Sequence, residues 1–280
     1  IGTGFLYGRF DKQIDEENNN YYVFLVTNKH VLNGHKQVYL KFNSAVDTSS
    51  TDYLIDLVAK NGKHIWVGHP DADVDVAVIS INANLLGEEQ RKYTFFRSDS
   101  QALASEQLKT EGVAEGDGIF VLGFPMGMVG AIRQYVVCRN GAIARIRDLH
   151  EGKAKNFLVD ATVFPGNSGG PVVIRPEAFS IIGTKPVEKA SLIGIVKSYV
   201  PYVDVATSQQ TRNARISFEE NSGLTLVEPV DHIIETVEVA IKRNRNRVAQ
   251  ARWKANRQTA AQFTIALDAV TPPASDAPIG

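Results

Sequence analysis

Cysteine is almost absent from this chain of 280 residues, which contains a single one, Cys138. One thiol cannot form an internal disulfide, and a chain of this length does not need one, because folding buries roughly 70–75% of the surface exposed by the unfolded chain. Disulfides accumulate in oxidising compartments, so the composition favours a cytoplasmic location. The sequence begins at Ile1 and shows no signal peptide. A periplasmic or secreted location is the alternative if such a segment was removed before Ile1.

Long apolar runs and an excess of charge of one sign are also missing. No stretch of 18 or more apolar residues occurs, so we expect no membrane span. The formal net charge is -1 at pH 7, which argues against nucleic acid as a partner, because such binding relies on many phosphate contacts from Lys and Arg. With 44% hydrophobic and 22% charged residues, the composition is that of an ordinary globular protein.

Short segments rich in β-branched and aromatic residues follow one another through the first 205 residues or so. Turn residues such as Asn61-Gly62 and Asn140-Gly141 separate them, which predicts an all-β fold, a sandwich or a pair of barrels. A polar stretch at about Arg97–Thr110 is interpreted as the connection between two barrels. Pro176–Ala190 and Asp204–Ser222 are interpreted as long loops. The predicted strands are Tyr22–Thr27, Val38–Phe42, Tyr53–Ala59, Val74–Ile81, Ile119–Gly123, Phe157–Thr162, Pro171–Ile174 and Leu192–Val196.

The pattern changes after Gly223. Apolar residues at helical spacing from Leu226 to Lys242 predict a C-terminal helix, with Pro229 in its first turn. Seven basic residues and no acidic ones lie between Lys242 and Arg257. This segment is interpreted either as a solvated helix end or as a docking site for an acidic partner. We therefore expect four parts, namely an N-terminal β-barrel over 1–100, a C-terminal β-barrel over 101–225, a helix with a basic end over 226–258, and a poorly ordered tail over 259–280.

The most specific motif is Pro165-Gly166-Asn167-Ser168-Gly169-Gly170-Pro171. A serine hydroxyl is a weak nucleophile and needs an adjacent base. The flanking glycines allow a sharp turn, so that the N–H groups of Gly166 and Ser168 can converge on the oxyanion of a tetrahedral intermediate. We predict Ser168 as the nucleophile and Gly166, Asn167 and Ser168 as the oxyanion hole. A glycine-rich turn that happens to contain serine is the alternative.

This motif resembles the nucleophile loop of trypsin-like serine peptidases, especially the high-temperature-requirement branch, in which asparagine precedes the serine. The resemblance implies a fold of two six-stranded antiparallel β-barrels, here with the C-terminal α-helix, and a base and an acid in the order His, Asp, Ser. His30 follows an apolar strand, and Leu25–Val31 is similar to the histidine segment of the family, although Asn28-Lys29 replaces smaller residues. We therefore predict His30 as the general base. The other histidines, His35, His64, His69, His150 and His232, are interpreted as surface residues.

Three carboxylates, those of Asp71, Asp73 and Asp75, compete for the third role. In the family an aspartate stands immediately before an apolar-Ala-Val-apolar strand, and this selects Asp75. Its carboxylate would hold the imidazole in the right tautomer and stabilise the imidazolium. Asp73 would share a strand face with Asp75 and stays the alternative, whereas Asp71 is interpreted as a solvated turn residue. The similarity covers about residues 1–240, and no PDZ domain is expected after it.

The resemblance implies a serine endopeptidase that hydrolyses protein or peptide substrates through an acyl-enzyme, without a metal or another cofactor. The alternative is a catalytically silent peptide-binding or scaffold protein that acts through its basic C-terminal segment. Family alignment places Thr162 at the base of the specificity pocket, and no acid is found there. We expect cleavage after small or medium uncharged residues, while Lys197 leaves an acidic preference as the alternative. The predicted pocket residues are Thr162, Val163, Phe164, Lys197, Ser198 and Tyr199.

Overall fold

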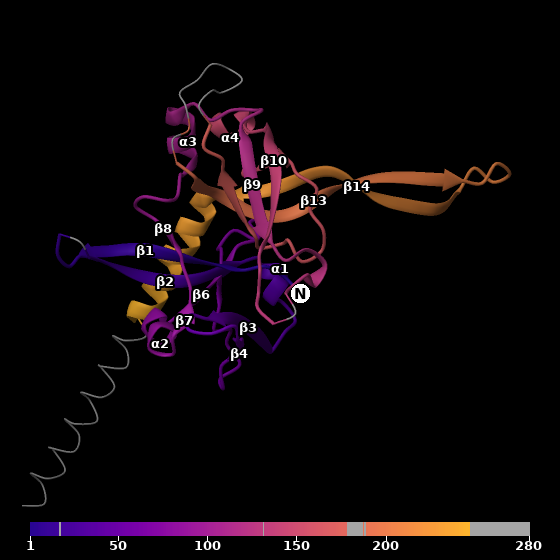
Figure 1. Ribbon diagram of the computed structural model, residues 1–280. Coiled ribbons are helices and arrows are strands. Elements are labelled where there is room, and N and C mark those ends of the chain that lie inside the picture. The colour runs from indigo at the N-terminus through magenta and orange to yellow at the C-terminus, as the bar shows by residue number, and fades with distance from the viewer. Residues whose placement is uncertain (17, 131, 178–186, 188, 247–280) are drawn as a thin grey trace, which may run out of the picture. The chain divides into compact units, whose positions relative to one another are not determined.

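Strands form most of the regular structure of this computed structural model, which describes residues 1–16, 18–130, 132–177, 187 and 189–246 (Figure 1). Ile1–Val237 forms one compact unit, and a second unit begins at Glu238. Every segment predicted as a strand overlaps an observed one. The prediction of a mostly β protein is therefore confirmed.

A five-stranded sheet in the first half of the chain positions His30 and Asp75. Its strand order is β5-β6-β2-β1-β8. β1 pairs antiparallel with β2, and β2 pairs antiparallel with β6, so the end of β2 lies beside the start of β6. The strands are β1 (Phe5–Gln13), β2 (Asn19–Thr27), β5 (Val67–Gly68), β6 (Ala77–Ser80) and β8 (Phe96–Arg97).

A separate three-stranded sheet of order β4-β3-β7 completes this half. It consists of β3 (Gln37–Ser44), β4 (Ser50–Asp56) and β7 (Arg91–Lys92), and β3 contributes Leu40 and Phe42 to the shared hydrophobic core. A closed six-stranded barrel is not confirmed here. Among the described residues the ladders belong to two separate sheets, and β5, β7 and β8 are each only two residues long.

The second half forms a closed barrel of six strands in the order β10-β11-β14-β13-β12-β9, as predicted. Apolar residues that alternate along these strands fill its interior, and Ile119, Ile174 and Ile193 are fully buried. The strands are β9 (Gly118–Gly123), β10 (Val137–Arg145), β11 (Phe157–Asp160), β12 (Pro171–Ile174), β13 (Ser191–Thr207) and β14 (Ala214–Pro229).

Short helices occupy several of the connections. The polar stretch at Arg97–Thr110 does link the two halves, but it is not all loop, since α3 occupies much of it. Gly112 ends α3 with a left-handed φ of 76°, which suits glycine. The short helices are α1 (Lys29–Leu32), α2 (Ala83–Glu88), α3 (Ser105–Glu111), α4 (Arg147–His150) and the 3₁₀ turn η1 (Pro125–Gly127).

Two interpretations of the C-terminal region need correction. The predicted loop Asp204–Ser222 is mostly strand, because β13 and β14 run on past the barrel as a paired ribbon. The predicted helix does not begin at Leu226, since β14 continues to Pro229 and Val227 pairs with Phe157 of β11. The helix covers residues 230–246 instead.

Some predictions fall on residues that the structure does not describe. They include most of the loop Pro176–Ala190, the basic segment from 247 to 257, and the tail 259–280. In the part of the chain that is described, no helix has the length and apolar content that crossing a membrane requires.

Candidate active site

His30 and Asp75 meet at the point where β2 and β6 lie side by side. His30 lies in α1, just after β2, and Asp75 precedes β6. The imidazole Nδ1 of His30 lies 2.5 Å from Oδ2 of Asp75, and the backbone N–H of His30 donates to Oδ1 at 3.1 Å. Both carboxylate oxygens of Asp75 therefore bond to His30, and the contact of Oδ2 with Nδ1 orients the ring.

The neighbouring carboxylates have a different partner. Lys155 Nζ lies 2.6 Å from Asp71 and 3.4 Å from Asp73. The hydrogen bond from Lys155 lowers the pKa of Asp71, so this carboxylate is ionised at neutral pH. Asp73 is exposed and points to Lys155, which leaves Asp75 as the carboxylate bonded to His30.

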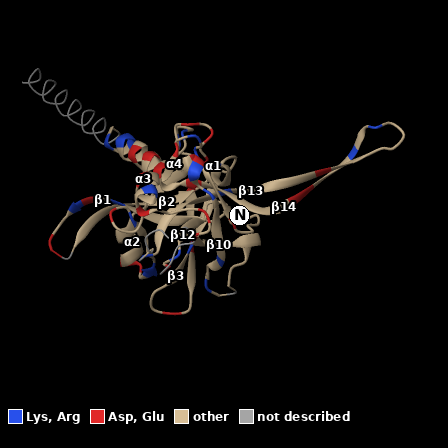
Figure 2. Cartoon of the chain, turned by 90° about the horizontal axis from the view of Figure 1, so that it is seen from above, with Lys and Arg blue, Asp and Glu red and all other residues tan. Residues whose placement is uncertain are grey.

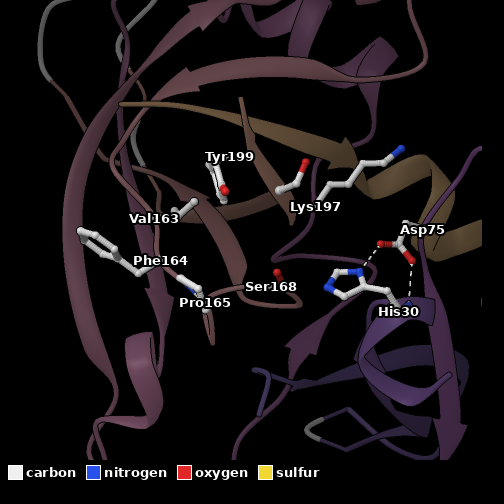
Figure 3. A pocket seen from close by; sticks show the side chains of 9 residues that line it. His30, Asp75, Val163, Phe164, Pro165, Ser168, Lys197 and Tyr199 are labelled. Atoms are coloured by element: carbon white, nitrogen blue, oxygen red, sulfur yellow. Dashed lines mark hydrogen bonds and ion pairs between the residues drawn. The ribbon is translucent and has the colours of Figure 1, made fainter. Parts of the chain in front are cut away.

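Ser168 shares a cavity with this pair. Figure 3 shows Ser168 on the side of the imidazole away from Asp75, with Val163, Phe164 and Tyr199 beyond Ser168. The cavity has a volume of about 410 Å³. Five of the six residues predicted for the specificity pocket line it, while Thr162 does not. The lining consists of His30, Asp75, Val163, Phe164, Pro165, Ser168, Lys197, Ser198 and Tyr199.

Two glycines give the serine loop its shape. Gly166 and Gly169 have φ values of 101° and 85°, a region that favours glycine. Space is also lacking, since a Cβ at Gly166 would lie 2.4 Å from the Phe124 carbonyl oxygen, and one at Gly169 would lie 2.1 Å from that of Thr3. The observed conformation of the loop therefore requires glycine at both positions.

Of the three residues predicted for the oxyanion hole, Asn167 already has its N–H bonded within the loop. The N–H of Asn167 donates to the Phe164 carbonyl oxygen at 2.9 Å, so it is not available to a substrate. The Asn167 side chain accepts the Phe164 N–H at 3.1 Å and thereby closes the same turn. Within the described residues no acceptor contacts the N–H of Gly166 or Ser168. These two groups have the freedom to bind a developing oxyanion.

Thr3 ties the serine loop to both halves of the protein, a role that the sequence did not reveal. Its hydroxyl donates to the Gly166 carbonyl oxygen at 2.6 Å and accepts the N–H of Phe124 at 3.0 Å. Its backbone N–H donates to the Ser168 carbonyl oxygen at 2.9 Å, and its own carbonyl oxygen accepts the hydroxyl of Thr27 at 2.8 Å. Because Thr3 is buried, these bonds are shielded from water.

A fully buried carboxylate, that of Glu228 near the end of β14, lies behind Asp75. Its Oε1 accepts the backbone N–H of Asp75 at 3.1 Å and lies 2.9 Å from Lys197 Nζ. Its Oε2 lies 2.7 Å from Nδ1 of His232. Burial alone would raise the pKa of Glu228, but the hydrogen bonds from His232, Lys197 and Asp75, together with the charge of Lys197, lower it overall. Glu228 is thus an ionised anchor for the segment that carries Asp75.

This network also bears on two sequence interpretations, the acidic preference left open for Lys197 and the surface position of His69 and His232. Lys197 Nζ donates to the carbonyl oxygen of Asp73 at 2.7 Å as well as contacting Glu228. Its ammonium therefore points away from the cavity (Figure 3). His69 and His232 are not surface residues: His69 is buried and bonded to Glu235 at 2.6 Å, and the rings of His69 and His232 are 5.2 Å apart.

Polar contacts also shape the inner wall of the cavity. The hydroxyl of Tyr199 donates to Glu219 at 2.6 Å, and this carboxylate raises the pKa of Tyr199. The side chain of Asn221 donates to the Val163 carbonyl oxygen at 2.6 Å. Within the described part of the chain, no group of three His, Cys, Asp or Glu side chains is arranged to hold a metal ion.

Comparison with models of protein families gives a match. Residues 2–182 match the model of the trypsin-like peptidase domain, and this span includes His30, Asp75 and Ser168. The search of curated proteins gives no match. Because the matched span covers well over half of the sequence, the chain belongs to the trypsin-like peptidase domain family.

Proposed function

We propose that this protein is a serine endopeptidase that cuts with Ser168, His30 and Asp75. The observation that carries the proposal is the contact of His30 with both oxygens of Asp75, with Ser168 across the imidazole in the same cavity. Membership of the trypsin-like peptidase domain family supports it. The asparagine before Ser168 supports placing the chain in the high-temperature-requirement branch of these peptidases.

The geometry supports acyl transfer in two steps. With Nδ1–H of His30 bonded to Asp75, Nε2 accepts the hydroxyl proton of Ser168 as its oxygen attacks the peptide carbonyl carbon. The N–H groups of Gly166 and Ser168 stabilise the oxyanion, and His30 returns the proton to the leaving amine. Water activated by His30 then hydrolyses the acyl-enzyme. The charge of Asp75 stabilises the imidazolium in both steps.

The lining of the cavity favours uncharged side chains at the cleavage site. Val163 and Phe164 present apolar surface, and Asp75 is the only acid among the lining residues, where it is already bonded to His30. An Arg or Lys side chain would therefore lack a partner. The ammonium of Lys197 is engaged by Glu228 and the carbonyl oxygen of Asp73, so an acidic side chain would lack one as well. We propose cleavage after small or medium uncharged residues.

The proposal is tested with a fluorophosphonate, which labels an activated serine without knowledge of the substrate. The folded protein should take up one adduct by mass, and Ser168→Ala and His30→Ala should take up none. Asp75→Asn should slow labelling by about 10³- to 10⁴-fold, while the matched control Asp73→Asn labels at the wild-type rate. No adduct on the folded wild-type protein would refute the proposal and favour a silent peptide-binding protein.

A further inference from the structure

Apart from the contacts that Glu219 and Asn221 make beside the cavity, no role in the peptidase site is evident for the ribbon of β13 and β14. It extends beyond the barrel in Figure 1, and its pairing runs from Pro201 with Asn221 to Thr207 with Ala214. β11 pairs with β14 only from 224 to 227, and β12 pairs with β13 only from 191 to 195. Within the described residues both outer edges of the ribbon are therefore unpaired. A two-stranded ribbon is marginally stable alone in water, and a free edge is a template for another strand.

The ribbon is also unusually apolar for such an exposed element. Alternating large side chains lie on both of its faces, because residues paired across the two strands share a face. Their exposed fractions are 58% for Tyr202, 53% for Val203, 45% for Val205, 56% for Ile216 and 52% for Phe218. A surface of this kind indicates a partner.

The two edges differ in how well they could accept a strand. On β13, Pro201 lacks an N–H to donate to a neighbouring strand. If β13 paired antiparallel with β13 of a second molecule around Asp204, the two Asp204 carboxylates would lie opposite each other. β14 has no proline between 214 and 221. Its charges are separated along the strand, with Arg215 toward the tip and Glu219 and Glu220 toward the barrel. Figure 2 shows basic residues near the tip of the ribbon and acidic residues nearer the barrel. The open edge is that of β14.

The sequence of this edge is complementary to itself. When two antiparallel copies of β14 are centred on Ser217, Arg215 of one copy lies opposite Glu219 of the other, and Ile216 lies opposite Phe218. The two-fold symmetry repeats each contact. A register centred on Ile216 would place Arg215 opposite Ser217, and one centred on Phe218 would place it opposite Asn221. In either register no acidic residue would lie directly opposite Arg215. Cross-strand pairs of opposite charge and of apolar residues stabilise a sheet.

We propose that β14 of one copy pairs antiparallel with β14 of a second copy, in the register centred on Ser217. The two ribbons then form one four-stranded sheet, in which the free backbone groups of residues 214–220 find partners. Glu219 also accepts the hydroxyl of Tyr199 through Oε1, and its second oxygen serves Arg215 of the other copy. This dimer does not depend on the peptidase activity.

Sedimentation velocity of the full chain over a dilution series tests the proposal without an activity assay. The wild type should sediment as a dimer that dissociates on dilution. Arg215→Glu and Glu219→Arg should each shift the equilibrium toward monomer, since each places two like-charge pairs in the interface. The double variant Arg215→Glu/Glu219→Arg restores opposite charges and should dimerise again, which would show that neither original side chain is needed for folding. The exposed Lys63→Glu has the same charge change as Arg215→Glu and should behave as wild type.

A wild type that is monomeric at every concentration would overturn the proposal. Single variants that dimerise like the wild type would overturn it too, as would a double variant that stays monomeric, because the register requires Arg215 and Glu219 to face each other. Failure of fluorophosphonate labelling would leave these sedimentation results unchanged, so the two proposals fail separately.

Discussion

Glu228 offers the sharpest test of how the fold holds Asp75, and two substitutions separate its charge from its hydrogen bonds. Glu228→Gln keeps an oxygen that can accept the N–H of Asp75 and the ammonium of Lys197, but it removes the negative charge. Glu228→Met has a similar size and removes both. Because Oε1 of Glu228 bonds directly to the backbone of Asp75, we expect the two variants to differ in activity as well as in stability.

The expected losses in the free energy of unfolding follow from the burial of Glu228 and from the partners that each substitution leaves without a hydrogen bond. Removing one member of a buried ion pair costs about 3–5 kcal/mol. Lys197 is 23% exposed in its side chain and keeps its bond to the carbonyl oxygen of Asp73, so we expect about 3 kcal/mol for Glu228→Met. Glu228→Gln loses only the charge-assisted part of its bonds, about 1–2 kcal/mol.

Urea unfolding measures these losses, and the rate of fluorophosphonate labelling measures the site. Releasing the Asp75 segment should slow labelling by about 10- to 100-fold in Glu228→Met, whereas Glu228→Gln should label at nearly the wild-type rate. Glu235→Gln is the control, because Glu235 contacts His69 and is exposed; it should cost less than about 1 kcal/mol. A Met variant that labels as fast as wild type would refute the positioning role.

The pH dependence of stability gives a second readout. The pKa of Glu228 is lowered in the folded protein, so its charge stabilises the fold above its unfolded pKa of about 4.3. This contribution is lost as the pH falls through the lower, folded pKa. The stability gap between wild type and Glu228→Gln should therefore be constant at neutral pH and narrow below about pH 4. A gap that widens in acid would contradict the lowered pKa.

Two further predictions concern the serine loop and the cavity. Thr3→Val removes the hydroxyl that bridges Gly166 and Phe124, so it should lower the free energy of unfolding by about 1–3 kcal/mol and slow labelling. Thr3→Ser keeps the hydroxyl and should retain both the stability and the labelling rate. Equal behaviour of the two variants in urea unfolding and labelling would count against the bridge. A peptide-library profile should show small or medium uncharged residues before the cleaved bond, and a profile dominated by Arg, or by Asp and Glu, would contradict the proposed preference.

The local sequence pattern was sufficient to predict most of the strands and the serine loop of this protein. Alternating β-branched residues predicted the strands, and the glycines around Ser168 predicted a loop that the structure confirms to need them, at φ values of 101° and 85°. The resemblance to trypsin-like peptidases directed the search to His30 and Asp75, which the structure brings into contact. Their catalytic roles stay predictions, as do the cytoplasmic location and an acidic partner for 242–257.

The local sequence pattern gave the wrong secondary structure where pairing with a distant strand decides between strand and helix. Leu226 and Val227 suit a helical stripe, yet they lie in β14 because β11 offers them a partner strand. The sequence of Asp204–Ser222 suggests a loop, but its residues on either side of the turn pair with each other as β13 and β14.

The tertiary structure alone decided what supports the site. The bond between Thr3 and Gly166 spans 163 positions of the sequence, and the bond between Asp75 and Glu228 spans 153. It also decided that Lys197 is neutralised by Glu228 and that His232 is largely buried beside it. Hydrophobic periodicity reports the face on which a residue lies and not the distant group that it meets. Buried polar groups take the partner that closure of the barrel brings to them, because an unpaired one would cost too much.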